Sequence, residues 1–120
     1  MFDHIGYNVA DFARSLAFYR AALAPLGHGV IGSGEGWAML GGPGGRLWIG
    51  SYGPAPGGIH VAFRAATRAQ VHEFHAAALG AGGRDNGGPG PRPNYGPTYY
   101  AAFVLDPDGH NVEAVCTAPA

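Results

Sequence analysis

The hydrophobic pattern begins with a short alternating segment, and a similar segment recurs near the middle of the chain. Residues 2–9 (FDHIGYNV) and 57–64 (GGIHVAFR) alternate with a period of two, which predicts half-buried β-strands. The bulky apolar face of each strand should pack on a helix, and the opposite, smaller face suits the lining of a cavity. The apolar positions are Ile5, Tyr7, Val9 and Ile59, Val61, Phe63, and the opposite positions are His4, Gly6, Asn8 and His60, Ala62, Arg64.

Each strand is followed by a segment with helical spacing. Residues 11–27 and 67–82 are predicted helices, with Asp11 and Thr67 as N-caps and Gly27 ending the first helix. The apolar stripes are Phe12, Leu16, Tyr19 and Leu23 in the first helix, and Val71, Phe74, Ala78 and Leu79 in the second.

Three further strands are expected after each helix, so the predicted order is βαβββ, twice. They cover residues 28–32, 37–40 and 46–52 in the first half, and 82–85, 99–105 and 110–116 in the second. The segment GGPGPRPNYGP, residues 87–97, is predicted to be a surface loop because it is rich in proline. Residues 106–109 (DPDG) fit a type I turn.

The two halves are related by an offset of 60 − 4 = 56 residues. A repeat of this length indicates one supersecondary unit used twice. We therefore predict an α+β fold, a single domain of residues 1–120 made of module one (1–56) and module two (57–120). The identical pairs at this offset include His4/His60, Phe18/Phe74, Leu23/Leu79 and Gly27/Gly83.

Composition narrows the class of protein. The chain is 47% hydrophobic and 12% charged with a net charge of −1, which argues for a folded domain and against a nucleic-acid or anionic-membrane surface. Cys116 is the only cysteine, so no intrachain disulfide can form, and it is expected to be a small core residue. No signal peptide or membrane-spanning segment is evident, and we expect a cytoplasmic protein.

The candidate chemistry lies in His4, His60 and Glu113. The histidines occupy equivalent places in the repeat, and Glu113 is an acidic residue among apolar neighbours in NVEAV. A buried carboxylate is costly unless it is paired or metal-bound. Two imidazoles and one carboxylate could hold a divalent ion such as iron, manganese, zinc or nickel and leave positions open for a substrate.

Structural roles for these residues stay open. Either histidine alone could be a satisfied strand residue, and Glu113 could pair with an arginine such as Arg46. The other histidines are expected at the surface: His72 and His75 on a solvated helix face, and His28 and His110 in turns.

The segments DHIGYNVADFARSLAFY, GGIHVAF and AAFVLDPDGHNVEAV resemble the vicinal oxygen chelate superfamily, which includes glyoxalase I, extradiol dioxygenases, fosfomycin-resistance thiol transferases and bleomycin-resistance proteins. The resemblance implies two βαβββ modules that form an open, cup-like mixed sheet with helices on the outer face. It also implies a metal in the cup that acts as a Lewis acid on two neighbouring substrate oxygens. Members often form homodimers, and some complete the cup with a module of the partner chain.

One departure from the family pattern concerns Trp48. Many glyoxalase I enzymes have a fourth ligand in the last strand of module one, and laying RLWIG on NVEAV puts Trp48 where Glu113 stands. This favours a site with three ligands. Candidate substrate contacts, with ordinary packing as the alternative, are Trp48 and Tyr100 as pocket aromatics, Asn94 and Tyr95 as a lid, and Arg92 for an anionic group.

The leading hypothesis from the sequence is a metal-dependent lyase, isomerase or dioxygenase acting on a small oxygen-rich molecule. His4, His60 and Glu113 would hold the ion, and Glu113 could double as a base when it leaves the metal. The alternative is a binding protein of the bleomycin-resistance type that sequesters a small molecule without chemistry. A third possibility is a subunit whose site serves dimer assembly only.

Overall fold

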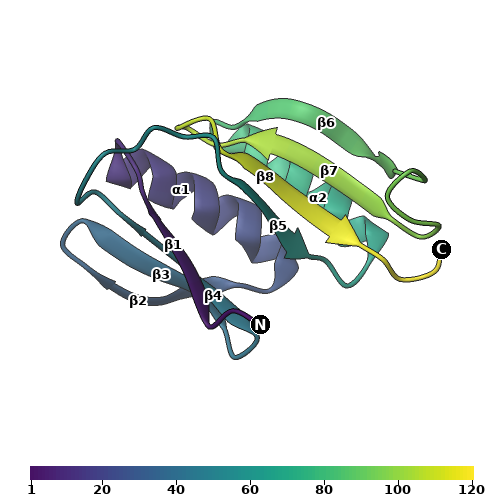
Figure 1. Ribbon diagram of the computed structural model, residues 1–120, viewed down its shortest axis with the longest axis horizontal. Coiled ribbons are helices and arrows are strands. Elements are labelled where there is room, and N and C mark those ends of the chain that lie inside the picture. The colour runs from purple at the N-terminus through teal and green to yellow at the C-terminus, as the bar shows by residue number, and fades with distance from the viewer.

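The computed structural model describes residues 1–120 and contains the predicted βαβββ order in both halves (Figure 1). Neither helix combines the length and apolar character that a membrane-crossing helix needs. Module one comprises β1 (His4–Asn8), α1 (Phe12–Leu23), a short 3-10 helix η1 (Ala24–Leu26), β2 (Gly29–Gly34), β3 (Trp37–Gly42) and β4 (Gly45–Gly50). Module two comprises β5 (His60–Arg64), α2 (Arg68–Gly80), β6 (Arg84–Pro91), β7 (Tyr100–Leu105) and β8 (Asn111–Cys116).

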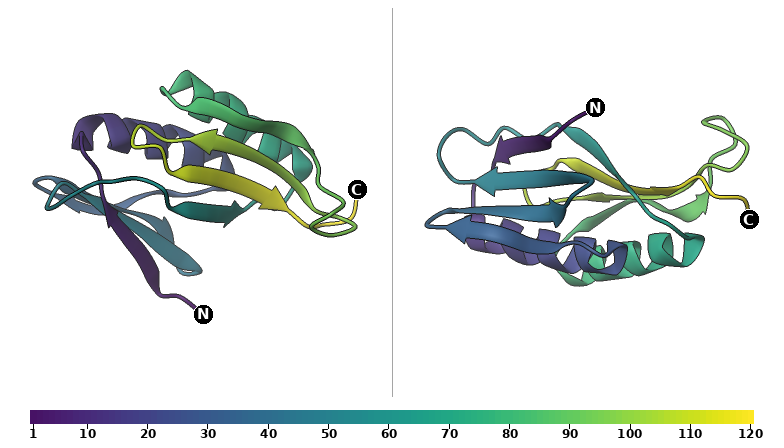
Figure 2. Two further views of the ribbon diagram at one scale, coloured as in Figure 1. Left: turned by 45° about the horizontal axis from the view of Figure 1, so that its top comes forward. Right: turned by 90° about the horizontal axis from the view of Figure 1, so that it is seen from below.

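Each module forms its own four-stranded mixed sheet. The strand orders are β1-β4-β3-β2 and β5-β8-β7-β6, and the β1–β4 and β5–β8 pairs are parallel whereas the other pairs are antiparallel. Both helices lie on the same side of the two sheets (Figure 2). The predicted α+β class with two open βαβββ modules is therefore confirmed, and the sheets do not close into a barrel.

The helix ends follow the predicted capping. The Asp11 side chain accepts a hydrogen bond from the Arg14 amide, and Thr67 does the same for Gln70, both at 3.1 Å. Gly27 has a φ of +89° after η1, a left-handed conformation that glycine adopts without a steric cost. The prediction for Leu79 is wrong, because its side chain is 37% exposed and only Val71, Phe74 and Ala78 of α2 are buried.

The second correction concerns β6. The sequence predicted a short strand at 82–85 and a proline-rich loop from residue 87, but the strand continues to Pro91. It is an edge strand, where a proline without an N–H can face away from its neighbour. Its pairing with β7 shifts register between Asp85 and Gly87 and again between Gly87 and Gly90, so the strand is irregular but still paired.

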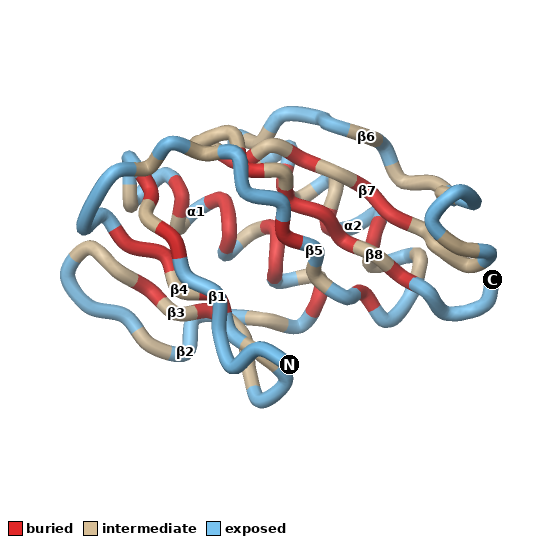
Figure 3. Tube along the Cα trace, viewed as in Figure 1, coloured by how far each residue is buried: buried red, intermediate tan, exposed pale blue.

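The buried apolar side chains form one cluster with members from both modules, and Figure 3 shows the buried positions along α1, β7 and β8. Phe18 of α1 and Phe74 of α2 are both fully buried. A Cβ atom at Gly83 would lie 2.6 Å from Phe18 and 2.5 Å from Val104, so only glycine permits this close approach between the modules. Cys116 is 1% exposed, as expected for a core residue.

A chain of polar contacts also joins the modules. The Tyr19 hydroxyl donates to Asp106 at 2.5 Å, and the Tyr7 and Tyr19 hydroxyls are 2.7 Å apart. Because the single hydroxyl proton of Tyr19 is used on Asp106, Tyr7 must donate to Tyr19. The Ala10 amide donates to Asp108, with 3.2 and 3.3 Å to its two oxygens. These bonds fix the turn between β7 and β8 against module one.

His110 belongs to the same cluster, and the prediction of a surface position for it is wrong. Its residue surface is 2% exposed, its ring lies 4.5 Å from the Tyr7 ring, and its Nδ1 accepts from the Ile59 amide at 3.1 Å. The Asp106 carboxylate accepts from the His110 amide, and the Asp106 carbonyl accepts from Gly109, which confirms the turn at 106–109. The inter-module polar cluster thus comprises Tyr7, Tyr19, Asp106, Asp108 and His110.

Candidate functional site

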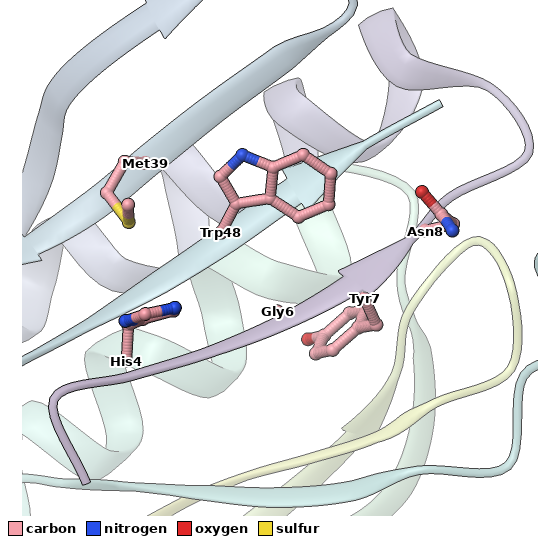
Figure 4. Close-up of a pocket in the computed structure, with 6 residues that line it drawn as sticks. All are labelled: His4, Gly6, Tyr7, Asn8, Met39 and Trp48. Atoms are coloured by element: carbon pink, nitrogen blue, oxygen red, sulfur yellow. The ribbon is translucent and has the colours of Figure 1, made fainter. Parts of the chain in front are cut away.

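Each module carries a pocket that is lined mainly by residues of its strands. The module-two pocket has a volume of about 510 Å³ and is lined by His60, Tyr95, Tyr99, Phe103, Asn111 and Glu113. The module-one pocket has a volume of about 450 Å³ and is lined by His4, Gly6, Tyr7, Asn8, Met39 and Trp48 (Figure 4). The two linings share no residue.

In the module-two pocket, a buried carboxylate faces an accessible imidazole. Glu113 is 1% exposed, and its Oε1 lies 2.8 Å from Nε2 of His60, whose side chain is 56% exposed. Strand pairing places them: β5 runs parallel to β8 with Ala62 opposite Glu113, and His60 lies two residues earlier on the same face of β5. Two ligands bound about 2.1 Å from one metal ion at right angles would lie roughly 3 Å apart, so this pair has the spacing of neighbouring metal ligands.

Tyr99, one of the aromatics that the sequence offered for the pocket but not one of the selected site residues, contacts Glu113 directly. Its hydroxyl donates to Oε2 of Glu113, the oxygen that His60 does not contact. Burial, together with the hydrogen bond to the Glu113 carboxylate, raises the pKa of Tyr99 to about 12. The alternation of side chains along the strand indicates its position. Residues 99 and 103 lie on the same face, and Phe103 is the residue paired with Glu113.

The same alternation explains the position of Tyr100, which the sequence proposed as a pocket aromatic. Tyr100 does not line either pocket and contacts α2 on the opposite side of the sheet. Its hydroxyl lies 2.6 Å from Nε2 of His72, and the Arg68 guanidinium lies 4.6 Å from the centre of its ring. His72 is exposed, as predicted, while His75 on the same helix bonds Asp85 at 2.9 Å.

The loop after β6 contributes one of its three candidate residues to the pocket. Tyr95 lines it, with its ring edge-on to Tyr99 at 5.4 Å. The Arg92 guanidinium donates to the carbonyls of Gly88 and Gly90 and lies 5.4 Å from the Phe103 ring, so it is engaged in holding the loop. Asn94 is exposed and does not line the pocket.

The module-one pocket is the counterpart of the module-two pocket with one chemical difference. Trp48 pairs with Gly6 as Glu113 pairs with Ala62, and 6 + 56 = 62, so the structure gives the same equivalence of Trp48 and Glu113 as the sequence. Figure 4 shows Trp48 and His4 in this pocket, on β4 and β1. The module-one pocket therefore offers an imidazole and an indole but no carboxylate from β4.

His4 is accessible and is held by its neighbour. Its Nδ1 lies 2.8 Å from Asp3, whose other oxygen accepts from Arg46 at 2.7 Å. The hydrogen bond to His4, followed by the charge of Arg46, lowers the pKa of Asp3. Arg46 thus pairs with Asp3, and the alternative partner for Glu113, an Arg46 ion pair, is not what the structure contains.

The structure brings together two of the three sequence-predicted metal ligands within the chain. His60 and Glu113 share a pocket, whereas His4 lies in the other pocket on the other sheet. The three do not form a group with ligand atoms close enough for one ion within a single chain.

Asp106, Asp108 and His110 do form a group whose ligand atoms lie within 4.8 Å of one another, close enough to hold a metal ion. Their acceptor atoms are already used by internal donors, including the Tyr19 hydroxyl on Asp106 and the Ile59 amide on Nδ1 of His110. With Nδ1 as an acceptor, the neutral His110 ring carries its proton on Nε2, which cannot then bind a cation. We therefore assign this group to the contact between the modules.

Comparisons with known proteins place these features in context. The sequence profile of the Glyoxalase/Bleomycin resistance protein/Dioxygenase superfamily matches residues 1–114. A glyoxalase/bleomycin resistance protein from Albidiferax ferrireducens T118 is 30% identical with a TM-score of 0.86, and the match covers 98% of both chains. A putative glyoxalase from Bacillus halodurans is 25% identical over 97% of this chain and 95% of its own, with a TM-score of 0.75. A lactoylglutathione lyase from Agrobacterium tumefaciens shares the fold, at 19% identity over 97% of this chain and 92% of its own with a TM-score of 0.69. No curated protein matches the chain.

Proposed function

Because the chain belongs to the Glyoxalase/Bleomycin resistance protein/Dioxygenase superfamily, we propose that it is a divalent-metal-dependent lyase or dioxygenase acting on a small molecule with two neighbouring oxygen atoms. The observation that carries the proposal is the 2.8 Å contact between the buried Glu113 carboxylate and the accessible His60 imidazole. A carboxylate that is 1% exposed and has no lysine or arginine partner is well suited to a cation.

The third ligand in this proposal is His4 of a second copy. Each chain has one pocket with His60 and Glu113 and an equivalent pocket with His4 and Trp48. In a homodimer, the His60 pocket of each copy would face the His4 pocket of the other, which would complete two sites. Strands β1 and β5 support this arrangement because each is an edge strand with one unpaired side. Ile5 and Ile59, at these edges, are 36% and 38% exposed and would gain cover from the second copy.

A bound ion would polarise the substrate oxygens as a Lewis acid. The role left to the chain is to position the substrate and move a proton. When it is not bound to the ion, Oε1 of Glu113, the oxygen beside His60, would be free to accept a proton from the substrate. Tyr95 and Phe103 would cover the apolar part of the substrate and exclude water.

Metal analysis of untagged protein tests this function. Wild-type protein should bind about one ion per chain in the dimer, and His60→Ala and Glu113→Gln should each lose it. His4→Ala should lose it as well, although His4 lies outside the module-two pocket of its own chain. His28→Ala is the matched control, because His28 lines neither pocket and should leave binding unchanged.

Light scattering on the same samples should report a dimer. Wild-type protein that binds no divalent ion in a titration, or a monomer in which His4→Ala has no effect, would contradict the proposal.

A second candidate, a binding protein that sequesters a small molecule without chemistry, is favoured by Trp48. An indole in the place of a carboxylate gives one wall of the site an aromatic surface suited to stacking. Under this alternative, ligand binding should survive His60→Ala without added metal. For either activity we propose a cytoplasmic location, since the single cysteine is a buried free thiol and suits a reducing compartment.

A further inference from the structure

The Tyr99 hydroxyl bonds to one of the two carboxylate oxygens of Glu113. We infer that Tyr99 is a positioning residue whose hydroxyl holds Oε2 of Glu113, so that only Oε1 is presented to the metal; this rests on the proposed metal-dependent function. The inference concerns a residue outside the expected ligand set of His4, His60 and Glu113. It starts from the different partners of the two carboxylate oxygens.

The two oxygens of Glu113 are assigned to different neighbours. Oε1 faces Nε2 of His60 at 2.8 Å, while Oε2 accepts from the Tyr99 hydroxyl. The carboxylate is 1% exposed, so water has little access to either oxygen. Rotation that turned both oxygens toward the ion beside His60 would break the hydrogen bond to Tyr99.

Tyr99 is itself held in place by its backbone and its ring. Its carbonyl accepts from the Arg92 amide at 2.8 Å, and its own amide donates to the Gly96 carbonyl at 3.3 Å. Its ring meets Tyr95 edge-on at 5.4 Å. The hydroxyl therefore comes from a loop, residues 92–99, whose ends are tied together, and the orientation of Glu113 depends on that loop.

Removal of this hydroxyl has a defined chemical consequence. Glu113 would keep its charge and its place on β8 but lose the donor on Oε2. Hydrogen-bond partners of metal-binding side chains orient those side chains, and their loss typically weakens metal affinity by about 10- to 100-fold. A carboxylate without such a partner can bind the ion through both oxygens instead of one.

A titration with cobalt(II) tests the inference on the protein of residues 1–120. Tyr99→Phe should weaken cobalt(II) binding about 10- to 100-fold and should change the visible absorption spectrum, which reports the coordination of the ion. Tyr100→Phe makes the same chemical change at the next residue, whose hydroxyl contacts His72 on the opposite side of the sheet and which lines neither pocket, so its cobalt(II) affinity should be unchanged. Circular dichroism would verify that both variants are folded.

Infrared difference spectra of the wild type give a test that does not need a variant. The splitting of the carboxylate stretches should indicate coordination through one oxygen. Coordination of Glu113 through both oxygens in the wild type, or a Tyr99→Phe protein with unchanged affinity and spectrum, would overturn the role of Tyr99 alone. Wild-type protein that binds no cobalt(II) would overturn the proposed function and this inference together.

Discussion

The replacement of Tyr19 by phenylalanine tests how much the inter-module polar cluster contributes to stability, because the Tyr19 hydroxyl links Tyr7 to Asp106. Tyr19 is fully buried, donates to Asp106 and accepts from Tyr7. The ring would remain, so packing against Phe18 is preserved. Only the hydroxyl that links Tyr7 of module one to Asp106 of module two is removed.

The expected cost follows from the groups left unpaired. In Tyr19→Phe, the buried Tyr7 hydroxyl loses its acceptor and Asp106 loses the donor on one oxygen. A buried polar group without a partner costs about 1–3 kcal/mol, and a hydrogen bond to a charged group is worth about 1.5–3 kcal/mol. The free energy of unfolding should therefore fall by roughly 2.5–6 kcal/mol.

Tyr7→Phe is the matched comparison. Its hydroxyl bonds only to Tyr19, which keeps its bond to Asp106, so the cost should be about 1 kcal/mol. The double variant should be as stable as Tyr19→Phe or more stable, because the hydroxyl that Tyr19→Phe leaves unpaired is then absent.

Urea unfolding followed by circular dichroism measures these differences. All variants should be compared at one protein concentration, since association contributes to the stability of a dimer. The slope of the unfolding free energy against urea should stay constant while the midpoint shifts. For a chain of this size, the melting temperature of Tyr19→Phe should fall by roughly 10–25 °C. Equal costs for the two single variants, or strictly additive costs in the double variant, would refute the proposed direction of the hydrogen-bond chain.

Three further predictions concern the dependence of stability on pH, the segment between β4 and β5, and the affinity for metal. Burial raises the pKa values of Tyr7 and Tyr19 in the folded protein. Below about pH 10, the ordinary tyrosine pKa, the folded and the unfolded chain both keep these phenols protonated. Above it only the unfolded chain loses the protons, so stability should fall with rising pH, and less steeply in the double phenylalanine variant, in urea unfolding from pH 8 to 11. Gly57→Ala should destabilise more than Gly58→Ala by thermal melting: both have positive φ, which costs about 1–2 kcal/mol for alanine, but only at Gly57 would the new Cβ lie 2.3 Å from a backbone oxygen. Trp48→Glu places a carboxylate opposite Gly6, as Glu113 is opposite Ala62, and should raise cobalt(II) affinity roughly tenfold, equivalent to about 1.4 kcal/mol; unchanged affinity would contradict the equivalence of the two strands.

Local patterns were sufficient to predict the elements of each module. The alternation around His4 and His60, the N-caps Asp11 and Thr67 and the repeat of 56 residues depend on neighbours in the sequence. Period and capping are properties of short segments, so they can be read without knowledge of the partner surfaces. The equivalence of Trp48 with Glu113 followed from the same repeat.

The exceptions are residues whose surroundings come from distant parts of the chain. The continuation of strand β6 to Pro91 was missed because prolines are tolerated only at a sheet edge, and edge position is a property of the complete sheet. His110 was assigned to the surface because its turn is polar, yet Tyr7, 103 residues earlier, covers it. Tyr100 was selected over Tyr99 because the pocket face of β7 is fixed by the pairing of Phe103 with Glu113, which lies outside the local sequence.

Two βαβββ modules, their capped helices and the candidate ligands His4, His60 and Glu113 could all be predicted from the order of the residues alone. That His60 and Glu113 share one pocket while His4 lies in another became evident only from the folded arrangement. The reason is that contacts between the modules, such as those of Tyr19 with Asp106 and Ala10 with Asp108, join residues 87 and 98 positions apart. No periodic pattern along the chain specifies how two such modules are oriented, because that orientation depends on the shapes and polar groups of both surfaces together.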